Sequence, residues 1–97
     1  MIAQYEQIRQ IDPNDATALV TLSGLYAAAQ NNDKVVAIGQ QLMQLDPQNY
    51  QYPLSVAQAL VNLGRTQEAV TAAQQALALA PDDQKPAIQQ FIAQLGG

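Results

Sequence analysis

Apolar side chains recur along this 97-residue chain at the three- and four-residue spacing of helices. Four apolar residues would share one helical face, Leu19, Leu22, Leu25 and Tyr26, and the polar run Gln30–Asp33 then interrupts the pattern. Spacing of the same kind resumes after each interruption, and alanine-rich segments with few β-branched pairs favour helix over strand. The pattern predicts an all-α chain of six helices, over residues 2–11, 15–29, 33–45, 50–63, 67–79 and 84–95.

Residue types near the expected helix ends support these boundaries. Pro53 and Pro86 fall in first turns, where a missing N–H costs little. Short polar side chains stand where N-caps are expected, at Asp15, Asp33, Thr66 and Asp83.

The breaks between helices follow a fixed period. Prolines at 13, 47 and 81 are 34 residues apart, and each lies in a similar short stretch of mostly polar residues. Apolar positions keep the same phase, so that Leu22 corresponds to Val56 and Leu42 to Ala76. Such a period is typical of a repeat array, in which each unit packs against its neighbours.

A helix–turn–helix unit of 34 residues closed by proline resembles the tetratricopeptide repeat (TPR) family, whose pattern is W-x2-L-G-x2-Y, A-x3-F and P. The first full unit has Leu19-x2-Leu22-Ser23-x2-Tyr26, Val35-x3-Gly39 and Pro47, and the second has Pro53-x2-Val56-Ala57-x2-Leu60, Ala69-x3-Ala73 and Pro81.

The resemblance implies a right-handed α-solenoid that forms one domain over residues 1–97. Residues 1–15 would be the second half of a truncated repeat, because Met1-x3-Tyr5 and Pro13 match only the back half of the pattern. Two full repeats would cover 16–49 and 50–83, and residues 84–97 resemble the solvating helix that ends such arrays.

Three positions depart from the family pattern. Ser23 and Val35 replace the usual Gly and Ala where paired helices cross, so the first hairpin should be more open than the second. Gly39 replaces an aromatic residue that packs on the following repeat. Tyr50 or Tyr52 could fill the space that this glycine leaves, although a simple packing variation is the plainer interpretation.

In TPR proteins the first helix of each pair lines a concave groove, and the resemblance therefore implies a partner-binding surface here. Its polar side chains could bond a peptide backbone, while its aliphatic ones could take apolar side chains; solvated helix face is the alternative. The implied lining is Thr17, Val20, Thr21, Gly24, Ala27 and Ala28 from the first unit, Gln51, Leu54, Ser55, Gln58, Val61 and Asn62 from the second, and Lys85, Ile88, Gln89 and Ile92 from the last helix. The basic residues with which some TPR proteins grip a C-terminal carboxylate are missing from both full units.

Composition narrows the possible functions. Charged residues are only 12% of the chain, and four Lys and Arg against eight Asp and Glu give a net charge of −4. Nucleic acids and anionic membranes attract clustered cations, so neither is an expected partner. No apolar run approaches the roughly 18 residues of a membrane span, and the first ten residues do not form a signal peptide. A soluble chain of unknown compartment is expected.

Catalysis and cofactor binding have little support. The chain has no cysteine or histidine, and therefore lacks the commonest nucleophile–base pairs and metal ligands. Nothing is available to activate Ser23 or Ser55, and most acidic residues stand near helix ends, where capping explains them. The turn from Asp12 to Asp15 lacks the pattern of a calcium loop. We therefore expect no enzyme activity, no metal and no cofactor.

The sequence favours a module that binds a peptide or helical segment of a partner protein. Self-association is an alternative. Ile2, Tyr5, Ile8 and Ile11 recur at helical spacing, and one stripe of helix 2–11 can pack on helix 15–29, but whatever would contact the missing partner helix is left exposed. A second alternative is an accessory repeat region of a larger enzyme or membrane-attached protein.

Overall fold

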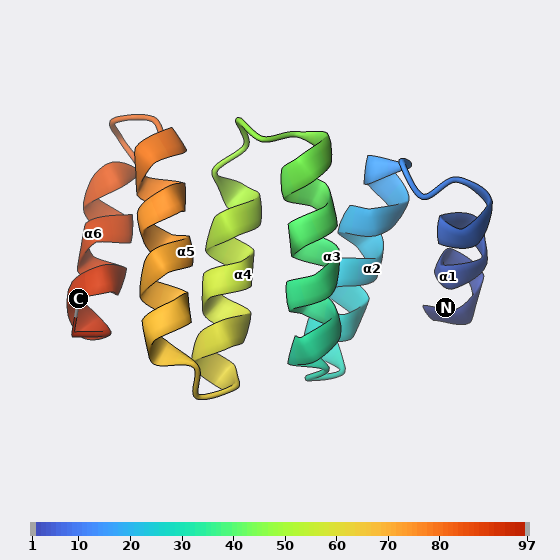
Figure 1. The fold of residues 1–97 in the computed structure, drawn as a ribbon, viewed down its shortest axis with the longest axis horizontal. Helices are drawn as coiled ribbons and strands as arrows, with labels where there is room; N and C mark the ends of the chain where they lie inside the picture. The colour runs from blue at the N-terminus through green and yellow to red at the C-terminus, as the bar shows by residue number, and fades with distance from the viewer. Residues whose placement is uncertain (1, 97) are drawn as a thin grey trace.

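The computed structural model describes residues 2–96, and all its regular elements are helices (Figure 1). No strand occurs within this described part of the chain. The prediction of an all-α fold with six helices is confirmed, and each helix lies within one residue of its expected bounds. The helices are α1 (Ile2–Ile11), α2 (Ala16–Ala28), α3 (Asn32–Leu45), α4 (Gln51–Asn62), α5 (Thr66–Leu79) and α6 (Lys85–Gln94).

The helices stand side by side in chain order, and each packs against the next along an array of 39 × 26 × 17 Å (Figure 1). The helices α2 and α3 form one hairpin, and α4 and α5 form another. The largest fully buried side chains are those of Leu19, Leu22, Ile38 and Pro53. No residue of α1 is fully buried, so this helix is held only by partly covered side chains such as Ile2 and Tyr5. The division of the chain into repeats at residues 16, 50 and 84 remains a prediction.

Only one of the four expected N-caps is correct. The side chain of Asp15 accepts a hydrogen bond from the amide of Ala18 at 3.2 Å and caps α2. The other three helices begin at residues whose side chains make no capping bond, at Asn31, Arg65 and Gln84. Asp33 and Thr66 instead lie inside the first turn, and Asp83 precedes the cap. Acidic or hydroxyl side chains near a helix start are favourable both at the N-cap and within the first turn.

The two hairpin turns share one geometry. After α4, the amide of Arg65 donates to the carbonyl of Leu60 at 2.9 Å, and Gly64 adopts a left-handed φ of 78°. This is the Schellman termination of a helix. After α2, Asn31 makes the corresponding bond, but the left-handed residue is Gln30, with a φ of 60°. A side chain is strained in that conformation, whereas glycine is not.

Gly39 marks a close approach between α3 and α4. A Cβ atom at this position would collide with Cγ2 of Val56, which lies directly opposite on α4. The expectation that Gly39 leaves a space for Tyr50 or Tyr52 is therefore wrong, since Val56 occupies it. Tyr52 lies beside the contact instead, at the edge of a pocket.

Candidate functional site

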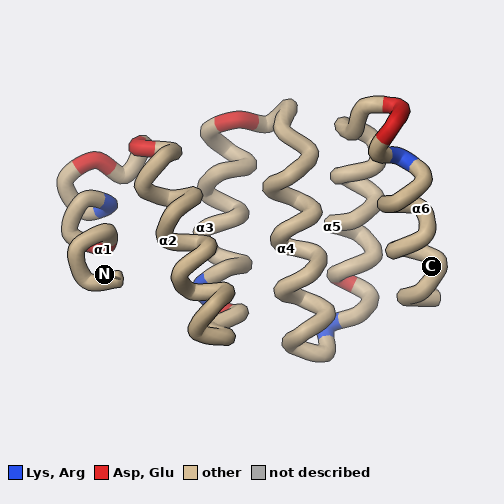
Figure 2. The backbone as a smooth tube through the Cα atoms, turned by 180° about the vertical axis from the view of Figure 1, so that it is seen from behind, with Lys and Arg blue, Asp and Glu red and all other residues tan. Residues whose placement is uncertain are grey.

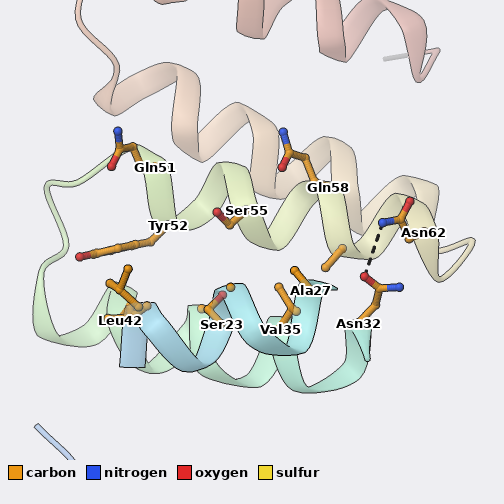
Figure 3. Close-up of a pocket in the computed structure, with 14 residues that line it drawn as sticks. Ser23, Ala27, Asn32, Val35, Leu42, Gln51, Tyr52, Ser55, Gln58 and Asn62 are labelled. Atoms are coloured by element: carbon orange, nitrogen blue, oxygen red, sulfur yellow. Dashed lines mark hydrogen bonds between the residues drawn. The ribbon is translucent and has the colours of Figure 1, made fainter. Parts of the chain in front are cut away.

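A pocket of about 330 Å³ opens between the two hairpins, bounded by α2 and α3 on one side and by α4 on the other (Figure 3). We name it the inter-hairpin pocket. Val20, Ser23, Gly24 and Ala27 come from α2; Asn32, Val35, Gly39 and Leu42 from α3; and Gln51, Tyr52, Ser55, Gln58, Ala59 and Asn62 from α4.

The pocket combines an apolar side with a polar one. Val35, Gly39 and Leu42 of α3 are buried, and Val20 of α2 is 46% exposed. Along α4, the polar side chains of Ser55 and Gln58 follow one another at helical spacing, and Figure 3 shows them above the apolar residues. Such a lining can cover an apolar side chain and also offer hydrogen bonds to a peptide backbone.

The two ends of the pocket differ. At one end, Asn62 Nδ2 donates a hydrogen bond to Asn32 Oδ1 at 3.4 Å, which links the end of α4 to the start of α3 (Figure 3). At the other end lies the ring of Tyr52, close to Leu42 in the same view. Beyond Tyr52, a shallower hollow continues toward the start of α2, and it shares Val20 and Tyr52 with the pocket. This second hollow is lined by Ala16, Thr17, Val20, Thr21 and Tyr52.

The structure brings together most residues of the expected groove in the two full units. The inter-hairpin pocket contains Val20, Gly24, Ala27, Gln51, Ser55, Gln58 and Asn62. Thr17 and Thr21 line the second hollow, where the Thr21 hydroxyl already donates to the carbonyl of Thr17 at 3.0 Å. Whether this lining binds a partner remains a prediction.

Other expected groove residues lie elsewhere. Leu54 and Val61 are partly buried and pack against the hydrophobic core, and Ala28 is exposed outside both hollows. Ile88 and Ile92 of α6 are buried in the core, so the expectation that they line a groove is wrong. They form the apolar stripe by which α6 packs on the array.

Sequence reasoning missed the contribution of α3. Asn32, Val35, Gly39 and Leu42 lie on the second helix of the hairpin, which was not expected to line the groove. One sequence feature could have indicated that α3 lines the pocket, namely Gly39 at a position where the TPR pattern has an aromatic residue. With no side chain at this position, α3 and α4 approach closely, and α3 forms part of the pocket wall.

The pocket lining has no Asp, Glu, Lys or Arg. Figure 2 shows no charged residue along α2 or α4. No three acidic residues within 2–96 are arranged so that they could hold a metal ion. The arrangement can therefore supply hydrogen bonds and apolar contact to an occupant.

One ionisable side chain forms a link between α1 and α2. The hydroxyl of Tyr26 donates a hydrogen bond to Glu6 Oε2, and Arg9 Nη1 lies 3.1 Å from Glu6 Oε1. The bond from Tyr26, assisted by Arg9, lowers the pKa of Glu6 below its ordinary value. The same bond, together with burial, raises the pKa of Tyr26. This link lies outside the inter-hairpin pocket and fastens α1 to the array.

The helices in residues 2–96 are too short and insufficiently apolar to cross a lipid bilayer.

The fold is closely similar to solved structures of MamA, a TPR-like helical repeat protein. A crystal structure of MamA matches with a TM-score of 0.84 at 19% sequence identity, over 97% of this chain and 54% of that chain. A second structure, MamA MSR-1 C2, has a TM-score of 0.82 at 23% identity, over 97% and 53% of the two chains. The chain has the fold of a TPR-like helical repeat.

This chain spans about half the length of the MamA chains it matches. No protein-family model matches the sequence, and no curated protein matches it. The likeness therefore establishes the fold, and function has to be argued from the pocket.

Proposed function

We propose that this chain is a protein-interaction module of the TPR family, and that the inter-hairpin pocket binds an extended or helical segment of a partner protein. The observation that supports the proposal most is the uncharged pocket of about 330 Å³ that lies between two packed hairpins. Repeat arrays of this kind use the surfaces between their units for binding. The lining offers hydrogen bonds and apolar surface without a carboxylate or an amine, which supports binding rather than catalysis.

Gly24 provides a way to block the pocket without changing charge. It lies in the exposed face of α2, and a Cβ built there meets no atom within 4 Å. A Gly24→Leu side chain would therefore enter open space, and leucine is also a better helix former than glycine. Ala37→Leu is the matched control, because it adds a leucine at an exposed position of α3 outside the pocket lining.

The experiment selects binders from a random dodecapeptide phage library with the purified chain as target. Recovered peptides are synthesised, and their affinities are measured by fluorescence anisotropy. We expect binding to fall at least tenfold with Gly24→Leu and to stay unchanged with Ala37→Leu, while circular dichroism remains helical for both. Equal binding by the two variants, or no recovered binder, would contradict the proposal.

Self-association is a second candidate, and one observation favours it. On the outer side of α1, Ile11 is 85% exposed and Ile8 is 39% exposed. Exposed apolar residues of this kind can mark a contact with another molecule. A mass that rises with concentration in light scattering, and that Ile11→Glu returns to the monomer value, would favour this role.

A further inference from the structure

Most of the net negative charge of the chain lies at one end of the array. The loops between α1 and α2, between α3 and α4, and between α5 and α6 all lie at that end (Figures 1 and 2). The opposite end carries two acidic and two basic residues, Asp33, Lys34, Arg65 and Glu68. The end with these three loops carries five acidic and two basic residues, Asp12, Asp15, Asp46, Asp82, Asp83, Arg9 and Lys85, and Arg9 is paired with Glu6 of α1.

The second hollow extends the inter-hairpin pocket from Tyr52 toward the start of α2, at this acidic end. Past Tyr52, the second hollow reaches Ala16, the first residue of α2, and Asp15 caps that helix. Asp46 ends α3 and begins the loop that leads into α4, where Gln51 and Tyr52 line the pocket. A segment that follows the two hollows therefore starts in an uncharged pocket and leaves toward the helix ends that carry Asp15 and Asp46.

We infer, on the basis of the proposed function, that the occupant is a peptide segment with a defined charge pattern. The part within the pocket is apolar and uncharged, and a lysine or arginine follows at the end that leaves past Asp15 and Asp46. Burying a charged group in the pocket would lose its hydration without a partner, since no lining residue is charged. A cation outside it would gain from the carboxylates, which act over a Debye length of about 8 Å at physiological salt.

The same charges disfavour two other occupants. An acidic segment would meet Asp15 and Asp46 with like charge, and like-charge contacts across an interface oppose binding. A second copy of this chain has the same net charge of −4, so its approach to the acidic end is repelled as well.

The test uses the peptides recovered from the dodecapeptide library. Only sequences whose binding is lost with Gly24→Leu are analysed, and their residue frequencies are compared with those of the unselected library. We expect an apolar core followed on one side by enriched Lys or Arg. Pocket-dependent peptides with acidic or unbiased flanks would overturn this inference and leave the proposed function intact. The absence of any pocket-dependent peptide would overturn both.

A pair of charge variants tests the position of the cation. Asp15→Asn with Asp46→Asn removes two charges beside the pocket exit, and asparagine preserves the N-cap of α2. Asp33→Asn with Glu68→Gln removes two charges from the opposite end and is the matched control. For a selected basic peptide, we expect the first pair to weaken binding by about three- to tenfold at low salt. The control pair should change the affinity by less than about twofold.

Salt provides the final check on the charge effect. Binding of the basic peptide should weaken as salt rises, and this dependence should shrink in the Asp15→Asn, Asp46→Asn variant. Equal salt dependence in the two double variants would overturn the assignment of the cation to this exit.

Discussion

The two hairpins occupy equivalent places in the 34-residue period but are packed differently. In the second hairpin, Ala57 and Ala69 are fully buried, and every buried residue of α5 is alanine. In the first hairpin the corresponding positions hold Ser23 and Val35, and both line the inter-hairpin pocket. The helices α4 and α5 also pack together more extensively than α2 and α3. Small side chains let α4 and α5 pack closely together. The larger side chains between α2 and α3 leave room beside them, where the inter-hairpin pocket lies.

The largest expected effect comes from giving the second hairpin a residue of the first. Ala69→Val adds two methyl groups at a fully buried position, and valine is a poorer helix former than alanine. We expect the free energy of unfolding to fall by about 2–3 kcal/mol in urea titrations. Ala78→Val, at an exposed position of the same helix, is the control and should cost only about 0.5–1 kcal/mol. A loss no larger than that of the control would mean that the second hairpin is not tightly closed.

Two glycines of the first hairpin should respond in opposite directions. Gly24→Ala enters open space and should raise the free energy of unfolding by about 0.5–1 kcal/mol through helix propensity. Gly39→Ala would collide with Val56, a stiff β-branched side chain, and should lower it by about 1 kcal/mol despite the same propensity gain.

The double variant Gly39→Ala with Val56→Ala checks the cause of this loss. Removing the opposing methyl groups should make the cost of Gly39→Ala smaller than it is alone, which a double-mutant cycle measures. If Gly39→Ala were stabilising in the original background, the close approach of α3 and α4 would be refuted.

The smallest expected effect is on the pH dependence of stability. It arises from the bond between Tyr26 and Glu6, which the counterpart of Tyr26 in the second hairpin, Leu60, cannot make. The pKa of Glu6 is lowered on folding. Its contribution to the free energy of unfolding is therefore present above about pH 4.3 and is lost as pH falls through the lowered pKa. The pKa of Tyr26 is raised, so its contribution is present below about pH 10 and is lost as pH rises through the raised value.

Variants at these positions measure the contribution of the link. Glu6→Gln should reduce the loss of unfolding free energy between pH 7 and pH 3 by roughly 0.5–1 kcal/mol. Glu68→Gln, which alters an exposed carboxylate on α5, should change that loss by less. Equal effects of the two variants would show that the bond between Glu6 and Tyr26 does not fasten α1 to the array.

Secondary structure was predictable because it depends on local spacing. Prolines at 13, 47 and 81 and the apolar phase between them located all six helices to within one residue. The exact caps were less predictable, because Asp33 and Thr66 are favourable both as caps and within a first turn. The turn after α2 also shows that Gln30 can take a place that glycine fills after α4.

The candidate site was predictable only in part. The resemblance to TPR proteins placed Val20, Gly24, Ser55 and Gln58 on one surface, and all four line the inter-hairpin pocket. It could not reveal that Leu54 packs into the core, or that α3 contributes to the pocket. Both depend on how closely neighbouring helices approach.

By itself, the sequence determined the helices, their 34-residue period and an uncharged surface, since each follows from residue types and their spacing. Tertiary structure decided where that surface opens into a pocket. The contact of Gly39 with Val56 draws α3 to α4, while Ser23 and Val35 face the space beside it. It also placed most of the net negative charge at one end, because the loops between α1 and α2, α3 and α4, and α5 and α6 lie there. Distances between helices depend on side-chain volumes across an interface, which a one-dimensional pattern does not specify.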